Sequence, residues 1–210
     1  MLLHPTSDLQ NLPGTRSYRR FARFGLLLCT LFFVCEAAQG AAVPESKVNA
    51  RYLVLFCRYV EWPPNLETVD KEKAFNVCVL GHDPFGNDLD SAFEGIIIDG
   101  KPVQLRRVES TQDALKCAVV FMSREETQVH SRWLQELQDK TILVVSDAEA
   151  TLQAGASVVL VRERIEGKEK VRFDVNLNAL RRAGLKISAR MRISARKVFG
   201  AEETETEATP

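Results

Sequence analysis

Three segments of this chain repeat one local pattern, and the repetition limits the fold more than any other feature of the sequence. Each segment is a short run of β-branched and other apolar residues, then a residue suited to cap a helix, then a helical sequence. The apolar runs are 77–80, 119–122 and 142–145, and their caps are Asp83, Ser123 and Ser146. Alternating strands and helices need crossover connections, so the pattern predicts a mostly parallel sheet.

The residues after these caps favour helices. Pro84 follows Asp83 at what would be the first helical position, where proline is well tolerated. Ser123 and Ser146 each have a glutamate three places later, which is the spacing of a capping box. We expect the helix after Ser123 to cover 124–138.

Two hairpins interrupt the alternation. The first joins 96–98 to 103–108 through Asp99-Gly100, a strong turn signal, and the second joins 158–165 to 171–175 through a charged loop. The expected architecture is therefore a compact three-layer α/β sandwich. It has a mostly parallel central sheet plus hairpins, with helices on both faces.

A nearly all-apolar helix precedes the sheet, from Ser46 to Trp62, and Pro63-Pro64 ends it. A helix without a polar face is buried on most sides. We expect its aromatic residues to be mostly buried, either in the core or in a contact between two copies of the chain. They are Tyr52, Phe56, Tyr59 and Trp62.

The end of the chain is predicted to be helical and basic. Helices are expected at 178–183 and 188–198, and Gly184 is suited to end the first of them. Seven cations fall between Ala179 and Gly200 with no acid among them: Arg181, Arg182, Lys186, Arg190, Arg192, Arg196 and Lys197. They form either a solvated helix face or a surface for an acidic partner or anionic headgroups.

Residues 1–42 have the layout of a secretory signal peptide. Several arginines precede an uncharged run of 12 residues at 24–35, and small residues follow. That run is too short to span a bilayer as a helix. We expect cleavage and a periplasmic location, with an uncleaved anchor as the alternative. One α/β domain is expected at 43–199, and a disordered acidic tail at 200–210.

The cysteines fit an oxidising compartment. Cys78 and Cys117 lie in or beside two predicted strands of one sheet, so we expect them to form a disulfide. Cys57 lies in the apolar helix and is expected to be a small buried thiol. The alternative is that all three are buried and reduced.

No motif for catalysis, a metal or a cofactor is found. The expected mature chain has two histidines, His82 and His130, without ligand spacing. The 28 basic and 28 acidic residues balance, so no nucleic-acid partner is indicated.

Ligands of open parallel sheets bind beyond the carboxyl ends of the strands, and helix N-termini there favour anions. The residues expected at this rim are Gly81, His82, Asp83, Ser123, Arg124, Ser146 and Asp147. The alternative is that most of these residues serve only to cap helices.

Several motifs together resemble the YfiR family, bacterial periplasmic proteins that restrain a membrane-bound diguanylate cyclase. The motifs are Val60-Glu61-Trp62-Pro63, the Cys78 strand with Gly81, Asp83, Pro84 and Phe85, the Cys117 strand, and Asn176-Leu177 leading to 183–188. The resemblance covers about 50–198. It implies a compact α/β fold that tends to dimerise, and the family's paired cysteines match Cys78 and Cys117.

By this resemblance the chain is a non-enzymatic repressor that binds an inner-membrane diguanylate cyclase and lowers cyclic-di-GMP. The late hairpin and last helix are the expected contact region, through Phe173, Arg190, Met191 and Arg192. The residues 189–192 replace a more apolar helix start in the family. The alternative function is a periplasmic small-molecule binding module that serves a sensor kinase or an uptake system.

Overall fold

The computed structural model describes residues 43–64 and 74–200. The chain divides into two units, Met1–Ala42 and Val43–Pro210, and the second contains all the described residues. The predictions for the export signal and for the polar connection at 65–73 lie outside the described residues, as does the tail prediction beyond Gly200. No helix in the described part is long and apolar enough to cross a membrane.

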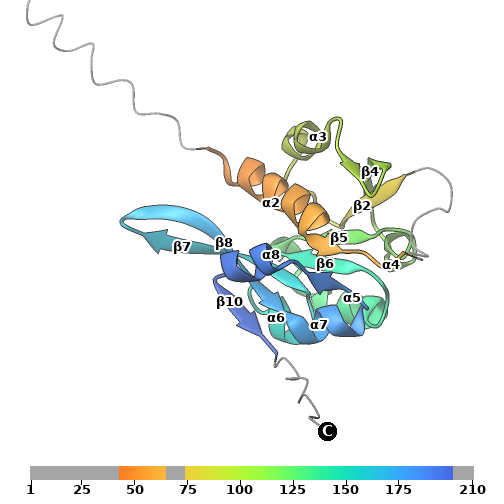
Figure 1. The fold of residues 1–210 in the computed structure, drawn as a ribbon. Helices are drawn as coiled ribbons and strands as arrows, with labels where there is room; N and C mark the ends of the chain where they lie inside the picture. Colours follow the sequence, from red (N-terminus) through yellow and green to blue (C-terminus); the bar gives the residue numbers. More distant parts are fainter. Residues whose placement is uncertain (1–42, 65–73, 201–210) are drawn as a thin grey trace, which may run out of the picture. The chain divides into compact units, whose positions relative to one another are not determined.

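An eight-stranded sheet forms the centre of the described unit (Figure 1). Its order is β10-β8-β7-β6-β5-β2-β4-β3, and β4, β2, β5, β6 and β7 run parallel as predicted. The strands are β2 Phe75–Leu80, β3 Ile97–Ile98, β4 Lys101–Val108, β5 Val119–Met122, β6 Leu143–Ser146, β7 Val158–Ile165, β8 Lys168–Asn176 and β10 Lys197–Phe199. A separate antiparallel pair joins β1 (Val60–Glu61) to β9 (Lys186–Ile187).

Helices cover both faces of the sheet. They are α2 Glu45–Tyr59, α3 Asn87–Phe93, α4 Thr111–Ala114, the 3-10 turn η1 Arg124–Glu126, α5 His130–Leu137, α6 Thr151–Ala154, α7 Leu177–Arg182 and α8 Ala189–Ser194. Alternate strand residues enter two cores, because successive side chains of a strand point to opposite faces. Val77 and Val79 join the core under α2 and α3, while Cys78 and Leu80 join the core under α5 and α6. The predicted three-layer sandwich is confirmed.

The first helix is one turn shorter than the sequence suggested. It ends at Tyr59, and Val60–Glu61 becomes a strand that pairs with β9. The Trp62 indole closes this end by donating a hydrogen bond from Nε1 to the Cys57 carbonyl at 2.9 Å. Phe56 is fully buried, whereas the other three aromatic residues are half-buried and pack on the same core. The core of one chain therefore covers Phe56 fully and the other three rings in part.

Two of the three predicted helix caps have other roles. Asp83 accepts the Phe85 amide across a tight turn at 2.8 Å, and α3 begins only at Asn87. Ser146 is the last residue of β6 and accepts the Ala148 amide, also across a tight turn. Polar residues after a strand can stabilise a turn as well as a helix, and the sequence does not separate these outcomes.

Ser123 does cap a helix, but the helix is broken. Its Oγ accepts the Glu125 amide at the start of η1, and α5 begins separately at His130. The predicted capping box is not closed, because Glu126 accepts the His82 amide at 3.0 Å. The glutamate therefore ties the η1 turn to the loop after β2.

Both hairpins are confirmed, and the second is longer than predicted. Its turn is only Glu166-Gly167, with positive φ angles of 52° and 76°, so β8 begins at Lys168. Only Val158 and Val159 of β7 pair with β6, at the last two residues of that strand. The rest of β7 therefore extends past the carboxyl end of the parallel sheet.

The last predicted helix is wrong in its second half. α8 ends at Ser194, and residues 197–199 form β10, a parallel edge strand on β8. Arg196 fixes this change by pairing with the buried Asp174 of β8 through two hydrogen bonds of 2.9 and 2.6 Å. A buried carboxylate needs a partner of opposite charge. Arg196 reaches Asp174 from beyond the end of α8, so the helix does not continue through it.

Cys78 and Cys117 form the predicted disulfide, with their Cα atoms 6.0 Å apart. Cys117 lies just before β5 rather than within it. The bridge closes a loop between residues 39 positions apart, which stabilises a domain by roughly 2–4 kcal/mol. Cys57 is a free buried thiol, as expected, and burial raises its pKa.

Candidate functional site

The carboxyl ends of the parallel strands meet where the strand order reverses. The connection from β2 leads to β4 on one side, whereas the chain from β5 leads to β6 and β7 on the other. Neighbouring loops that diverge in this way leave a crevice between β2 and β5. Phe85 follows β2 and packs edge-on against Phe121 of β5 with ring centroids 4.6 Å apart, which forms the crevice floor.

A pocket of about 250 Å³ opens at this crevice. The parallel strands contribute the loops after β2, β5 and β6. The first turns of α2 and the projecting strand β7 supply the remaining wall. The lining residues are Glu45, Ser46, Asn49, Pro84, Phe85, Ser123, Arg124, Glu125, Asp147 and Arg162. We call this the rim pocket.

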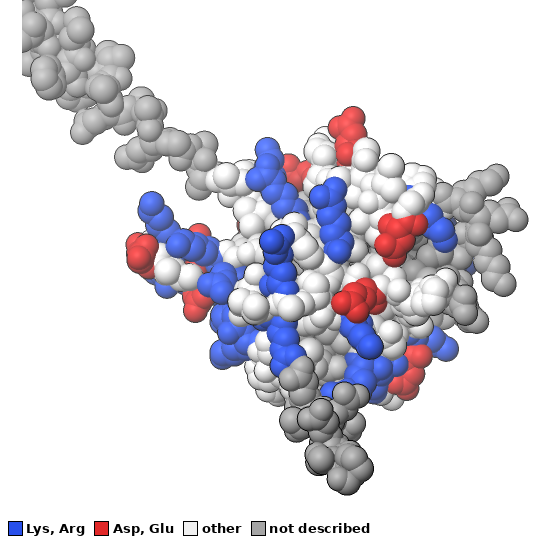
Figure 2. All heavy atoms as spheres, in the orientation of Figure 1, with Lys and Arg blue, Asp and Glu red and all other residues white. Residues whose placement is uncertain are grey.

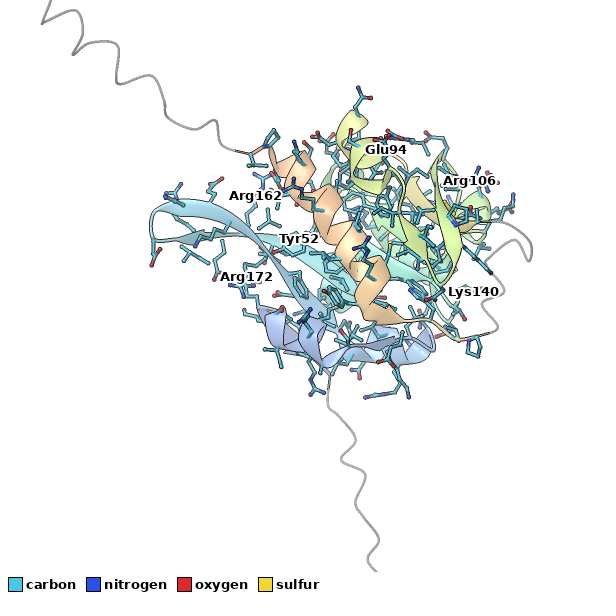
Figure 3. All side chains as sticks on the ribbon, turned by 45° about the horizontal axis from the view of Figure 1, so that its top comes forward. Tyr52, Glu94, Arg106, Lys140, Arg162 and Arg172 are labelled. Carbon is cyan, nitrogen blue, oxygen red and sulfur yellow. A yellow bond between two sulfur atoms is a disulfide. The ribbon has the colours of Figure 1, made fainter. Side chains whose placement is uncertain are left out.

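A chain of ion pairs crosses the rim pocket. Arg124 donates to Asp147 through its backbone amide at 2.6 Å and through Nε at 2.7 Å, and its Nη2 reaches Glu45 at 2.8 Å. Arg162 contacts the same Glu45 carboxylate from β7 at 2.8 Å. Glu45 therefore joins the start of α2 to both the rim and the hairpin; Figure 3 labels Arg162 beside the first turns of the helix.

This network sets the electrostatics of the pocket. Burial acts against the charged form of Arg124, but hydrogen bonds to Asp147 and the nearby charges of Asp147 and Glu45 outweigh it and raise the Arg124 pKa. Three carboxylates line the pocket against two guanidinium groups. Two of the three helix termini expected to attract an anion are replaced by turns, at Asp83 and Ser146, and the third begins only the short 3-10 turn after Ser123.

Asn49 is the unusual polar residue of the pocket. It is 3% exposed and lies on the wall formed by α2, and its Oδ1 has no hydrogen-bond partner. An unpaired buried acceptor costs about 1–3 kcal/mol. Such an atom in a native protein calls for an explanation.

The rim pocket contains three of the seven rim residues predicted from the sequence. Ser123, Arg124 and Asp147 line it. The other four do not: Gly81, His82, Asp83 and Ser146. Gly81 has a positive φ of 76°, and a Cβ there would lie 2.8 Å from the Trp133 ring, so this glycine serves packing. His82 faces Glu125 at 3.1 Å, and Asp83 pairs with Arg107 at 2.9 Å.

Seven residues that line the pocket were not predicted as ligand residues. Four of them lie on α2 or β7: Glu45, Ser46, Asn49 and Arg162. Their positions depend on how α2 and the hairpin pack against the rim, which no local pattern specifies. One signal was available. Asn49 lies four positions before Leu53, on the side of the helix that the apolar residues mark, and buried polar residues need a partner.

A second surface lies on the outward side of α2 and on α8. The exposed residues of α2 are Lys47, Arg51, Leu55 and Arg58, at helical spacing. Arg190 of α8 donates to the Tyr59 hydroxyl at 3.3 Å, which joins the two helices. Ile193 follows on α8 and is 85% exposed. We call this the α2–α8 face, and Figure 2 shows basic side chains spread over it.

The predicted partner residues separate into two groups. Phe173 and Met191 are 5% and 3% exposed and belong to the core. Phe173 packs on Tyr52 and Phe56 with ring centroids 5.7 and 5.1 Å apart. Arg190 is exposed and Arg192 is half-buried. In α8, Met191 is buried, and Ile193, two positions later, faces outward. The sequence did not indicate this exposed isoleucine.

No group of three potential metal ligands occurs within residues 43–64 and 74–200. In these ranges His130, a buried histidine, places Nε2 2.7 Å from the Ser123 carbonyl oxygen and so supports the rim loop.

A family model described as YfiR/HmsC-like matches residues 46–196. No curated protein matches the chain in sequence. Two solved structures resemble it at 12% identity: the ABC domain from Streptococcus pneumonia in complex with L-Trp, and a conserved domain protein from Vibrio cholerae. Their TM-scores are 0.47 and 0.48, over 71% and 75% of this chain. The match spans 60% and 61% of those chains, and it carries no information on ligand or partner.

Proposed function

The chain belongs to the YfiR/HmsC-like family, and from this premise we propose that it is a periplasmic regulator that binds an inner-membrane diguanylate cyclase and lowers cyclic-di-GMP output. The family match over 46–196 is the observation that carries the proposal, because it includes almost every described element. The protein acts by binding and catalyses no reaction of its own.

The signal-like segment at 1–42 supports export. Export is tested by fractionating cells and sequencing the N-terminus of the recovered protein. A mature N-terminus near residue 43 in the periplasmic fraction is expected. Full-length protein in the cytoplasm would contradict the proposal.

The α2–α8 face is the surface that we propose for the cyclase. It combines exposed arginines with two exposed apolar residues, Leu55 and Ile193, and protein interfaces favour arginine with apolar contacts. No ion pair of the described residues involves Arg51 or Arg58. Their positive charges are available to an acidic patch on the sensory domain of the cyclase, which would also speed association.

Cellular cyclic-di-GMP tests the function. Deleting the gene should raise the nucleotide level, and restoring the protein should lower it again. Unchanged nucleotide on deletion would defeat the repressor proposal.

Two variants at exposed residues test the surface. Ile193→Glu should fail to restore repression, whereas the matched control Ile97→Glu should restore it, since Ile97 is 63% exposed on the distant β3 hairpin. Both variants should melt at the temperature of the unmodified protein. Full repression by Ile193→Glu would reject the surface and leave the function standing.

Dimerisation is a separate part of the proposal and follows from the family resemblance. Light scattering should give twice the mass of one chain. Leu55→Glu tests whether the α2–α8 face supplies the dimer contact.

A further inference from the structure

The rim pocket lies apart from the α2–α8 face and has no part in the proposed binding of a cyclase. Both use α2, but from different sides: Glu45, Ser46 and Asn49 face the pocket, and Arg51, Leu55 and Arg58 face outward. The pocket combines three features that point to a small ligand, and each is independent of the family.

The first feature is position. The pocket occupies the crevice beyond β2 and β5 where the strand order reverses, which is where open α/β sheets bind ligands. Its volume of about 250 Å³ suits a small molecule. Pro84 and Phe85 give it an apolar side against which a short carbon chain can pack.

The second feature is charge. Arg124 and Arg162 are already occupied by Asp147 and Glu45, so neither guanidinium is left to hold an anion. Glu125 adds a third carboxylate, which lies 3.1 Å from the His82 ring. With three carboxylates against two guanidinium groups, the lining carries one negative charge in excess, and this favours a cation.

The third feature is the unpaired acceptor. Asn49 Oδ1 is buried in the pocket wall without a donor. Terminal amide torsions are broad, so a modest turn about the Cβ–Cγ bond can bring this oxygen to the pocket surface. An ammonium group supplies the missing donor, and hydrogen bonds to charged donors are the stronger ones.

We propose that the rim pocket binds a small organic cation through a primary ammonium group. The ammonium donates to Asn49 Oδ1 and to the Glu45 carboxylate, and the carbon chain lies along Phe85. Glu45 exchanges part of its contact with Arg162 for the ligand, so binding loosens the link between α2 and the projecting hairpin.

Matched probes of opposite charge test the proposal. Butylamine and 1,4-diaminobutane are compared with butanoate and succinate, which have the same numbers of carbons. Calorimetry with the purified protein should detect the amines and not the acids. In NMR spectra the side-chain amide of Asn49 should shift on addition of amine. Binding of the acids in preference to the amines, or of none of the four at millimolar concentration, would overturn the proposal.

Two variants locate the binding. Asn49→Leu removes the acceptor at similar volume and should weaken amine binding about tenfold or more. Without ligand it should melt no lower than the unmodified protein, because an unsatisfied buried group has been removed. A purely structural Asn49 would give a lower melting temperature and unchanged binding.

Glu45→Gln is the second variant. Glu45 is partly exposed, so this change does not alter the core as a change at the buried Asn49 does. It should weaken amine binding several-fold, whereas the control Glu94→Gln on the exposed end of α3 should not. Equal amine affinity in all of these proteins would show nonspecific attraction and reject the site.

Discussion

The two sides of α2 carry charges in contrasting ways. On the pocket side, Glu45 is held between Arg124 and Arg162 at 2.8 Å. On the outward side, Arg51 and Arg58 have no ion-pair partner among the described residues. Glu45 and Arg124 are partly withdrawn from water and are paired, whereas arginines without a partner remain hydrated and available. The pocket side is therefore built into the fold, and the outward side is left open for contact.

The apolar residues of the helix show the same contrast and give the largest expected effect. Leu53 is fully buried and Leu55 is 41% exposed. Leu53→Ala should lower the free energy of unfolding by about 3 kcal/mol, because it leaves a cavity in the core. Leu55→Ala should change it by less than about 0.5 kcal/mol. Urea denaturation measures both, and similar losses for the two variants would mean that α2 has no outward side.

Arg124→Met should have the next largest effect. It leaves the Asp147 side chain, which is 4% exposed, without its cation. Breaking a buried pair in this way should lower the free energy of unfolding by about 2 kcal/mol, after allowance for the partial exposure of Arg124. Adding Asp147→Asn should recover part of the loss, because the unpaired charge is removed. If the single variant unfolds at the same urea concentration as the unmodified protein, the pocket network contributes nothing to stability.

Glu45→Gln should cost less, at most about 1 kcal/mol, because its partners are partly exposed. The loss should shrink at high salt, which screens such pairs. Hydrogen exchange should be faster for amides of β7 and β8 near Arg162. The control is Glu169→Gln on the same hairpin, where the pair with Arg164 is exposed at both ends. Equal exchange rates in the two variants would show that Glu45 does not stabilise the hairpin.

The sequence predicts the sheet well because strands obey a local rule. The runs 77–80 and 119–122 are apolar throughout, as strands covered on both faces require, and alternate side chains of each strand enter the two cores. The disulfide between Cys78 and Cys117 follows from adjacent strands in the same way. Boundaries were predicted less well, because Ser146 and Asp83 stabilise turns where a helix cap was expected.

The rim pocket was predicted only in part, for a physical reason. Residues that directly follow parallel strands share one edge of the sheet, and this rule found Ser123, Arg124 and Asp147. Asn49 and Arg162 reach the pocket through packing of α2 and the hairpin, which depends on contacts far apart in sequence. The burial of Met191 was not foreseen for the same reason. The end of α8 depends on the pair of Arg196 with Asp174, which are far apart in sequence.

The smallest expected effect tests the outward side directly. Replacing Arg51 and Arg58 together by Gln should change the free energy of unfolding by less than about 0.5 kcal/mol at both low and high salt. The two residues are seven positions apart, about 10 Å along a helix, so their mutual repulsion is already screened at physiological ionic strength. Lys47 lies one turn before Arg51, and relieving that like-charge pair offsets some of any loss. A loss above about 1 kcal/mol would mean that these arginines are paired within the folded chain, and the contrast between the two sides of α2 would fail.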